Sequence, residues 1–190
     1  MPPMSPAPQA AVPLCIPLDR TCRSHLLGAL QRGVAVPARL PCPVSAFLVQ
    51  QLGLEPDYVE RRISTIFLDG DVVDAAETAT LRDGSQLALS AAMPGLVGAT
   101  LRKGGFYAAM RADITRAADG ATLGDDTAPG VVTVRLFNLL IDELSGALLR
   151  HGILLGRDEA VALLDALGRP VPPLPPGARV LLTASEPSQP

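Results

Sequence analysis

The alternation of apolar and polar residues is clearest between residues 61 and 90. Residues 63–68 alternate between two faces, as the side chains of a strand do. The dipeptide Asp69-Gly70 follows, and it readily adopts the positive φ angles of a hairpin turn. A second turn at residues 83–85 leads into a second strand at residues 86–89. The pattern predicts a sheet rich in hairpins. It contains no catalytic residue set, so it indicates the fold and not an activity.

Other segments carry helical or strand-like patterns. Helices are predicted at residues 22–30, 44–52, 141–149 and 158–167, each with a glycine at or soon after its end. Further strands are predicted at residues 13–18, 34–36, 131–137, 153–155 and 178–183. The first of these is expected at a sheet edge, because its prolines cannot donate ladder hydrogen bonds. Residues 55–60 are interpreted as a polar connection, and residues 106–114 fit either a strand or the start of a helix.

These elements predict an α+β protein divided into several parts. A flexible tail at residues 1–11 precedes a first domain at residues 12–115. Residues 116–130 have few large apolar side chains and are interpreted as a linker or exposed loop. A smaller α+β unit is predicted at residues 131–185, and residues 186–190 form a second tail.

The smaller unit has some features of a second copy of the first. Gly28-Ala29-Leu30 and the following Arg32-Gly33 resemble Gly146-Ala147-Leu148 and the segment Arg150–Gly152. A predicted helix and a final strand follow in both halves. Such short matches also arise by chance in a chain rich in Ala, Leu and Gly, so both a duplication and a coincidence stay open.

Composition and charge narrow the class of protein. Hydrophobic residues make up 48% of the 190 residues, enough for a real core, and the net charge is −3. This charge argues against general nucleic-acid binding. No apolar run reaches the roughly 18 residues of a membrane helix. The first residues lack the features of a signal peptide, and three cysteines form no disulfide framework, so a cytoplasmic location is expected.

Three segments together resemble the β-grasp (ubiquitin-like) fold. They are residues 44–48 at the start of a helix, residues 65–70 in a strand and turn, and residues 81–89 in a last strand. More narrowly, the order is similar to the sulfur carriers, such as the small subunit of molybdopterin synthase and the thiamine sulfur carrier. The resemblance implies a mixed sheet packed on a helix. In that family the last strand leads to a terminal Gly-Gly, whereas here Gly104-Gly105 is followed by a long C-terminal part.

Two functions follow from these observations. The first is a non-catalytic interaction or assembly module that binds a protein partner, or a second copy of itself, through an exposed sheet face or edge. The alternative is a sulfur-carrier precursor that is cleaved after Gly105. No catalytic residue set supports an enzyme. The candidate binding residues surround the loop after the last strand of the first domain: Met93, Gly95, Gly98, Arg102, Lys103, Gly104 and Gly105.

Other candidate chemistry is weaker. Cys15, Cys22, His25 and Cys42 contain residue types that bind zinc, but they lack the paired short spacings of common zinc sites. They are interpreted as thiols and a surface histidine, and no metal or cofactor is expected. Arg102, Lys103 and Arg111 are candidates for anion binding beside a glycine-rich backbone. The chain contains no phosphate-binding P-loop motif.

Overall fold

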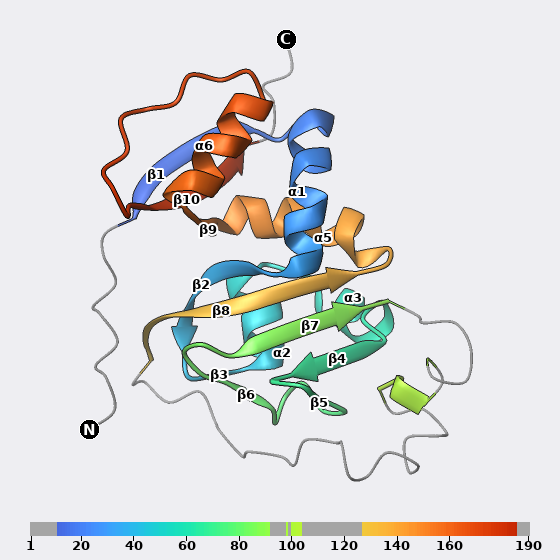
Figure 1. Ribbon diagram of the computed structural model, residues 1–190. Helices are drawn as coiled ribbons and strands as arrows, with labels where there is room; N and C mark the ends of the chain where they lie inside the picture. Colours follow the sequence, from blue (N-terminus) through green and yellow to red (C-terminus); the bar gives the residue numbers. More distant parts are fainter. Residues whose placement is uncertain (1–10, 92–97, 99, 104–126, 186–190) are drawn as a thin grey trace.

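The computed structural model describes residues 11–91, 98, 100–103 and 127–185, and it confirms a mixed α+β fold (Figure 1). The strands are β1 (Val12–Pro17), β2 (Val34–Leu40), β3 (Cys42–Pro43), β4 (Thr65–Leu68), β5 (Asp71–Val72), β6 (Thr80–Leu81), β7 (Gln86–Ser90), β8 (Ala128–Phe137), β9 (Ile153–Gly156) and β10 (Arg179–Ser185). The helices are α1 (Arg20–Arg32), α2 (Val44–Ala46), the π-helical turn η1 (Phe47–Gln51), α3 (Pro56–Arg61), α5 (Leu140–His151) and α6 (Arg157–Ala166).

One mixed sheet of eight strands organises the described residues, in the order β1-β10-β9-β2-β8-β7-β4-β5. The pairs β1–β10 and β8–β7 are parallel, and the other neighbours are antiparallel. Strand β8 comes late in the chain, yet it lies between β2 and β7 (Figure 1). Strands from both predicted units therefore share one sheet, and the boundaries of those units stay a prediction.

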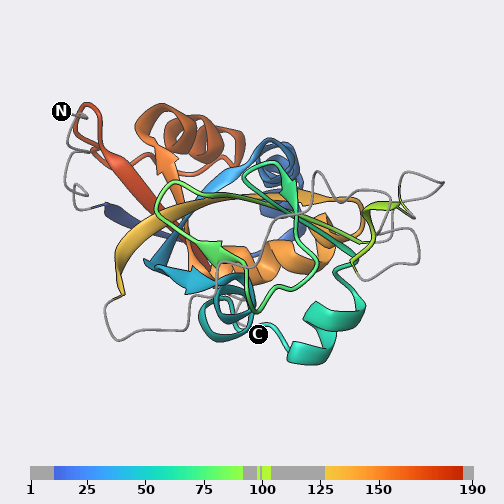
Figure 2. The ribbon, with the colours of Figure 1, turned by 90° about the horizontal axis from the view of Figure 1, so that it is seen from below.

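The strands around β8 have one buried and one open face. The buried positions are Val34, Val36, Ala38 and Leu40 of β2, Val132, Val134 and Leu136 of β8, and Leu87 and Leu89 of β7. Leu144 and Leu148 of α5 lie against Val134, Leu136 and Leu89 on this side. Figure 2 shows α5, α2 and α3 on the same side of β8. Alternation along the strands makes this side the core.

We call the other side of the same strands the open face. Its positions are Ala35, Pro37 and Arg39 of β2, Pro129, Val131, Thr133, Arg135 and Phe137 of β8, Gln86, Ala88 and Ser90 of β7, and Thr65 and Phe67 of β4. Thr65 and Ser90 are buried, whereas the others are partly or fully exposed. In Figure 1 none of the described helices crosses the front of β8, β7 and β4.

Several local predictions are confirmed. Asp69 and Gly70 have φ angles of 55° and 100°, so the hairpin turn forms where Asp-Gly predicted it. The Asp69 carboxylate also accepts a hydrogen bond of 2.8 Å from the backbone N–H of Gln86, which ties the turn to β7. Strand β1 lies at one edge of the sheet, as its prolines predicted.

Two predictions about element limits are wrong. Residues 55–60 are mostly the helix α3, not a polar connection. Pro56 stands in its first turn beside Asp57, and Arg61 stands in its last turn, which are favourable places for these residue types. Strand β8 begins at Ala128, inside the range interpreted as a linker. The rest of that range up to residue 126, the tail at residues 1–10 and the segment 106–114 lie outside the described residues.

The two halves share one detailed geometry, in which a helix ends at a glycine that opens a strand. Gly33 follows α1 with φ 117°, and Gly152 follows α5 with φ 109°. A Cβ on Gly33 would lie 2.9 Å from Cγ2 of Thr133, and a Cβ on Gly152 would lie 2.9 Å from Cδ1 of Leu181. Both positions therefore require glycine, for conformation and for space. Duplication itself stays a prediction.

No helix in the described part of the chain has the length and apolar character that crossing a membrane requires.

Candidate functional site

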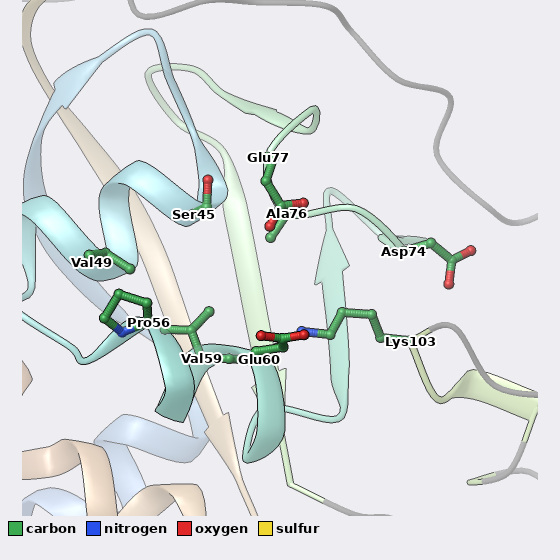
Figure 3. Close-up of a pocket in the computed structure, with 9 residues that line it drawn as sticks. All are labelled: Ser45, Val49, Pro56, Val59, Glu60, Asp74, Ala76, Glu77 and Lys103. Carbon is green, nitrogen blue, oxygen red and sulfur yellow. The ribbon is translucent and has the colours of Figure 1, made fainter.

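A cavity of about 500 Å³ lies between α2–η1, α3 and the connection from β5 to β6 (Figure 3). The apolar side chains of Val49, Val59 and Ala76 line part of the cavity, and Ser45 and Pro56 also line it. The charged lining residues are Glu60, Asp74, Glu77 and Lys103. The cavity thus gathers side chains from four segments that are separate in the sequence.

Lys103 is the one lysine in the chain, and the other basic side chains, apart from histidine, are arginines. Its backbone N–H donates a hydrogen bond of 2.8 Å to the carbonyl of Ser64. Its Nζ donates one of 3.2 Å to the carbonyl of Val59, in the last turn of α3. Burial lowers the pKa of Lys103, while the charges of Glu77 and Glu60 oppose this change.

The electrostatics of the cavity favour a cation. Three carboxylates and one ammonium group face a partly apolar space, so the formal charge of the lining is negative. The sequence pattern had suggested an anion near Arg102 and Lys103, but the acidic surroundings of Lys103 disfavour one. Within the described residues, no group of His, Cys, Asp or Glu side chains could hold a metal ion.

The other candidate binding residues are placed differently. Gly98 is buried, and the exposed Arg102 does not line the cavity beside Lys103. The remaining candidates, Met93, Gly95, Gly104 and Gly105, lie outside the described residues, as does Arg111. Sequence reasoning missed Glu60, Asp74 and Glu77, because a lone acidic residue in a turn or short helix carries no signal of its eventual neighbours.

The cysteines and His25 lie on separate elements. Cys15 is exposed on β1, Cys22 is buried in α1, and Cys42 is buried in β3. His25 is exposed on α1. Burial raises the pKa of the Cys22 and Cys42 thiols, which disfavours their thiolate forms.

A second candidate site is a hollow of about 230 Å³ on the open face, near the end of β8. Strand register explains it. Phe67 of β4, Ala88 of β7 and Arg135 of β8 form one row across the sheet. Thr65, Ser90 and Phe137 form the next row. The small Ala88 and Ser90 thus leave a depression flanked by two phenylalanines; we call it the Ala88 hollow.

The polar groups at the Ala88 hollow are held in place. Ser90 is buried, and its hydroxyl accepts a hydrogen bond of 3.0 Å from the side-chain amide of Asn138. The same hydroxyl donates to the carbonyl of Ala91. Phe137, by contrast, leaves 41% of its surface exposed. The exposed ring of Phe137 thus adds apolar surface to the lining of the hollow.

Charge on the open face has one sign. Its strand positions include Arg39 and Arg135 and contain no Asp or Glu, although the whole chain has a net charge of −3. Arg39 donates hydrogen bonds to the hydroxyl and carbonyl of Thr127. The exposed Arg135 has no hydrogen-bond or ion-pair partner within the described part of the chain.

Comparisons of the chain with protein-family models, with curated proteins and with solved structures found no match.

Proposed function

We propose that the protein is a non-catalytic β-grasp module whose open face binds a protein partner. The Ala88 hollow is the observation that carries this proposal. It is an apolar depression that includes the exposed Phe137, and the exposed Arg135 pairs with Ala88 in the strand register, on the side of the sheet that the described helices leave open. Aromatic and arginine side chains are the residue types that contribute most often to protein–protein binding energy.

Strand order supports the β-grasp part of the proposal. The strands β2-β8-β7-β4-β5 form a mixed sheet in which β8 and β7 are parallel and the other pairs are antiparallel. The segment between β2 and β4 contains α2 and η1, whose Phe47 and Leu48 are fully buried. A mixed sheet packed on a helix is what the sequence resemblance implies. Strand β8 would then supply the first β-grasp strand from a late position in the chain.

The sulfur-carrier alternative meets a physical difficulty. Cleavage after Gly105 would cut the chain before β8, which pairs with both β2 and β7 in the middle of the sheet. A separated N-terminal fragment would leave two strands without their shared neighbour. Mass spectrometry of the protein from its native cell tests this alternative. A fragment ending at Gly105 with the mass of a thiocarboxylate would favour the carrier function over the module.

Site-specific photo-crosslinking in the native cell tests the interaction module. A photo-crosslinking amino acid replaces Ala88 in one variant and Gln50 in the control; Gln50 is exposed on η1 and does not belong to the open face. The expected result is a protein adduct from position 88 and none from position 50. The identified protein, once purified, is expected to bind the wild type and to lose binding to Phe137→Ser.

Circular dichroism of Phe137→Ser establishes that the variant is folded. An adduct with the mass of two copies of the chain would identify self-association as the interaction. Equal adducts from positions 88 and 50, or purified partner that binds Phe137→Ser as well as the wild type, would contradict the proposal.

A further inference from the structure

We infer that the Ala88 hollow recognises an acidic, apolar segment of a partner protein, with Arg135 binding its carboxylate. The inference rests on the proposed function and adds the chemistry of the partner. The segment would place an apolar side chain against Phe67 and Phe137. It would place an Asp or Glu side chain on the guanidinium of Arg135.

The shape of the hollow supports a side chain as its occupant. At about 230 Å³ it is smaller than the roughly 300–1,000 Å³ typical of small-molecule sites. Its lining includes the short side chains of Ala88 and Ser90 on β7. A surface depression between two phenylalanine rings suits one projecting apolar side chain of a larger partner, whose remaining surface would lie across the open face.

The position of Arg135 supports a carboxylate beside that apolar side chain. Arg135 is the direct neighbour of Ala88 in the register of β7 and β8. On its other side lies Gly33, over which the Arg135 side chain packs: a Cβ there would stand 3.1 Å from Cγ of Arg135 and 3.2 Å from its Nε. Arg135 is exposed beside the hollow without lining it, and its guanidinium can donate two parallel hydrogen bonds to one carboxylate.

The positive charge of the open face favours a partner segment with negative charge. Arg39 and Arg135 are its charged strand positions, and no carboxylate among those positions neutralises them. An acidic segment complements this face, whereas a basic one is repelled. Nucleic acid fits less well, because its binding depends on many phosphate contacts and the chain as a whole is negative.

Selection from a library of random short peptides displayed on phage tests the inference on the intact protein. Peptides selected by the wild type are expected to carry Asp or Glu close to Leu, Ile, Met or Phe. Arg135→Glu is expected to weaken their binding on the order of tenfold or more, since one charge-assisted contact becomes repulsive. Replacing the acidic residue of a selected peptide by Lys is expected to restore binding to Arg135→Glu.

Two further variants make the test specific. Arg135→Gln removes the charge without reversing it and is expected to fall between the wild type and Arg135→Glu. Arg20→Glu changes an exposed arginine at the start of α1 and is expected to leave binding unchanged. Circular dichroism and thermal unfolding show that each variant is folded.

Each outcome separates this inference from the proposed function. Peptides that bind at the Ala88 hollow without acidic enrichment, or that bind Arg135→Glu equally well, would overturn the inference and leave the interaction module standing. Preferential binding of a single-stranded oligonucleotide through Phe67 and Phe137 would overturn both. If no selected peptide binds the hollow, and position 88 also yields no adduct in the cell, both are wrong.

Discussion

Tyr58 of α3 donates a hydrogen bond of 2.6 Å from its hydroxyl to Oε2 of Glu143 in the first turn of α5. Arg62, directly after α3, donates from Nε to both oxygens of the same carboxylate, at 3.0 and 2.9 Å, and its guanidinium forms an ion pair with it. One carboxylate thus joins two helices that are far apart in the sequence. Burial and the neighbouring Glu143 raise the pKa of Tyr58, and the hydrogen bonds from Arg62 and Tyr58 lower that of Glu143 to about 2.

The first prediction concerns stability. Glu143→Gln removes the ion pair and weakens both hydrogen-bonded contacts, so it is expected to lower the free energy of unfolding. Because the pair is partly exposed to solvent, the loss is expected to be about 1 kcal/mol. That corresponds to a fall in Tm of about 2–4 °C for a chain of this size. Thermal denaturation followed by circular dichroism measures it.

Asp142→Asn is the matched control for this change. Asp142 is exposed in the same first turn of α5, so its loss removes the same charge from the same end of the helix. It is expected to change Tm by less than half as much. Equal effects of the two substitutions would show that Glu143 acts through the helix dipole and not through Tyr58 and Arg62.

The second prediction concerns pH. The pKa of Glu143 is lower in the folded protein than the ordinary value of 4.5, so the folded state holds this proton less tightly than the unfolded state. Its stabilising contribution is therefore complete above about pH 4.5 and is lost as the pH falls toward about 2. The difference in unfolding free energy between the wild type and Glu143→Gln is expected to shrink across this window. Urea titrations at several pH values measure it; a constant difference would contradict the assignment.

The third prediction concerns the amine of Lys103. Because burial lowers its pKa, competitive labelling with an acylating reagent is expected to give a midpoint below the ordinary 10.5. The chain has one lysine, so mass spectrometry assigns the label without ambiguity. Glu77→Gln removes the larger of the two opposing charges and is expected to lower the midpoint further.

Glu159→Gln is the control for this experiment, because Glu159 lies on α6 and does not line the cavity of Lys103. It is expected to leave the midpoint unchanged. A midpoint at or above 10.5 in the wild type would mean that the carboxylates of the cavity outweigh burial.

The fourth prediction concerns the glycine that opens β2. Gly33→Ala forces a side chain onto a backbone with φ 117° and places its Cβ 2.9 Å from Cγ2 of Thr133. The expected destabilisation is about 3 kcal/mol, the sum of conformational strain and overpacking. Gly53→Ala is the control, since Gly53 has φ 70° but a Cβ added there would have no atom within 4 Å, and about 1 kcal/mol is expected. Equal losses would exclude the contact with Thr133.

The locally encoded features were predictable. The turn at Asp69-Gly70, the glycine after α1 and the glycine after α5 each follow from residue types that adopt positive φ without strain. The helices α5 and α6 follow from apolar spacing and from acidic residues in their first turns. In each case a few neighbouring residues contain the whole signal.

Features that depend on distant residues were not predictable in the same way. Helix α3 has one buried apolar residue, Val59, so it shows little periodicity, and its contacts come from Glu143 and Lys103. The cavity beside Lys103 needs Glu60 and Glu77 from other segments. A pattern within one segment contains no information about which other segment will pack on it.

The sequence by itself determined the α+β class, the positions of most strands and helices, and the alternation that separates a buried face from an open one. The tertiary structure alone decided that β8 lies between β2 and β7. That placement sets Arg135 and Phe137 beside Ala88 and Ser90, and it creates the Ala88 hollow. Alternation specifies which side of a strand is apolar, whereas the choice of neighbouring strand depends on how all the elements together bury their apolar faces and satisfy their backbone hydrogen bonds.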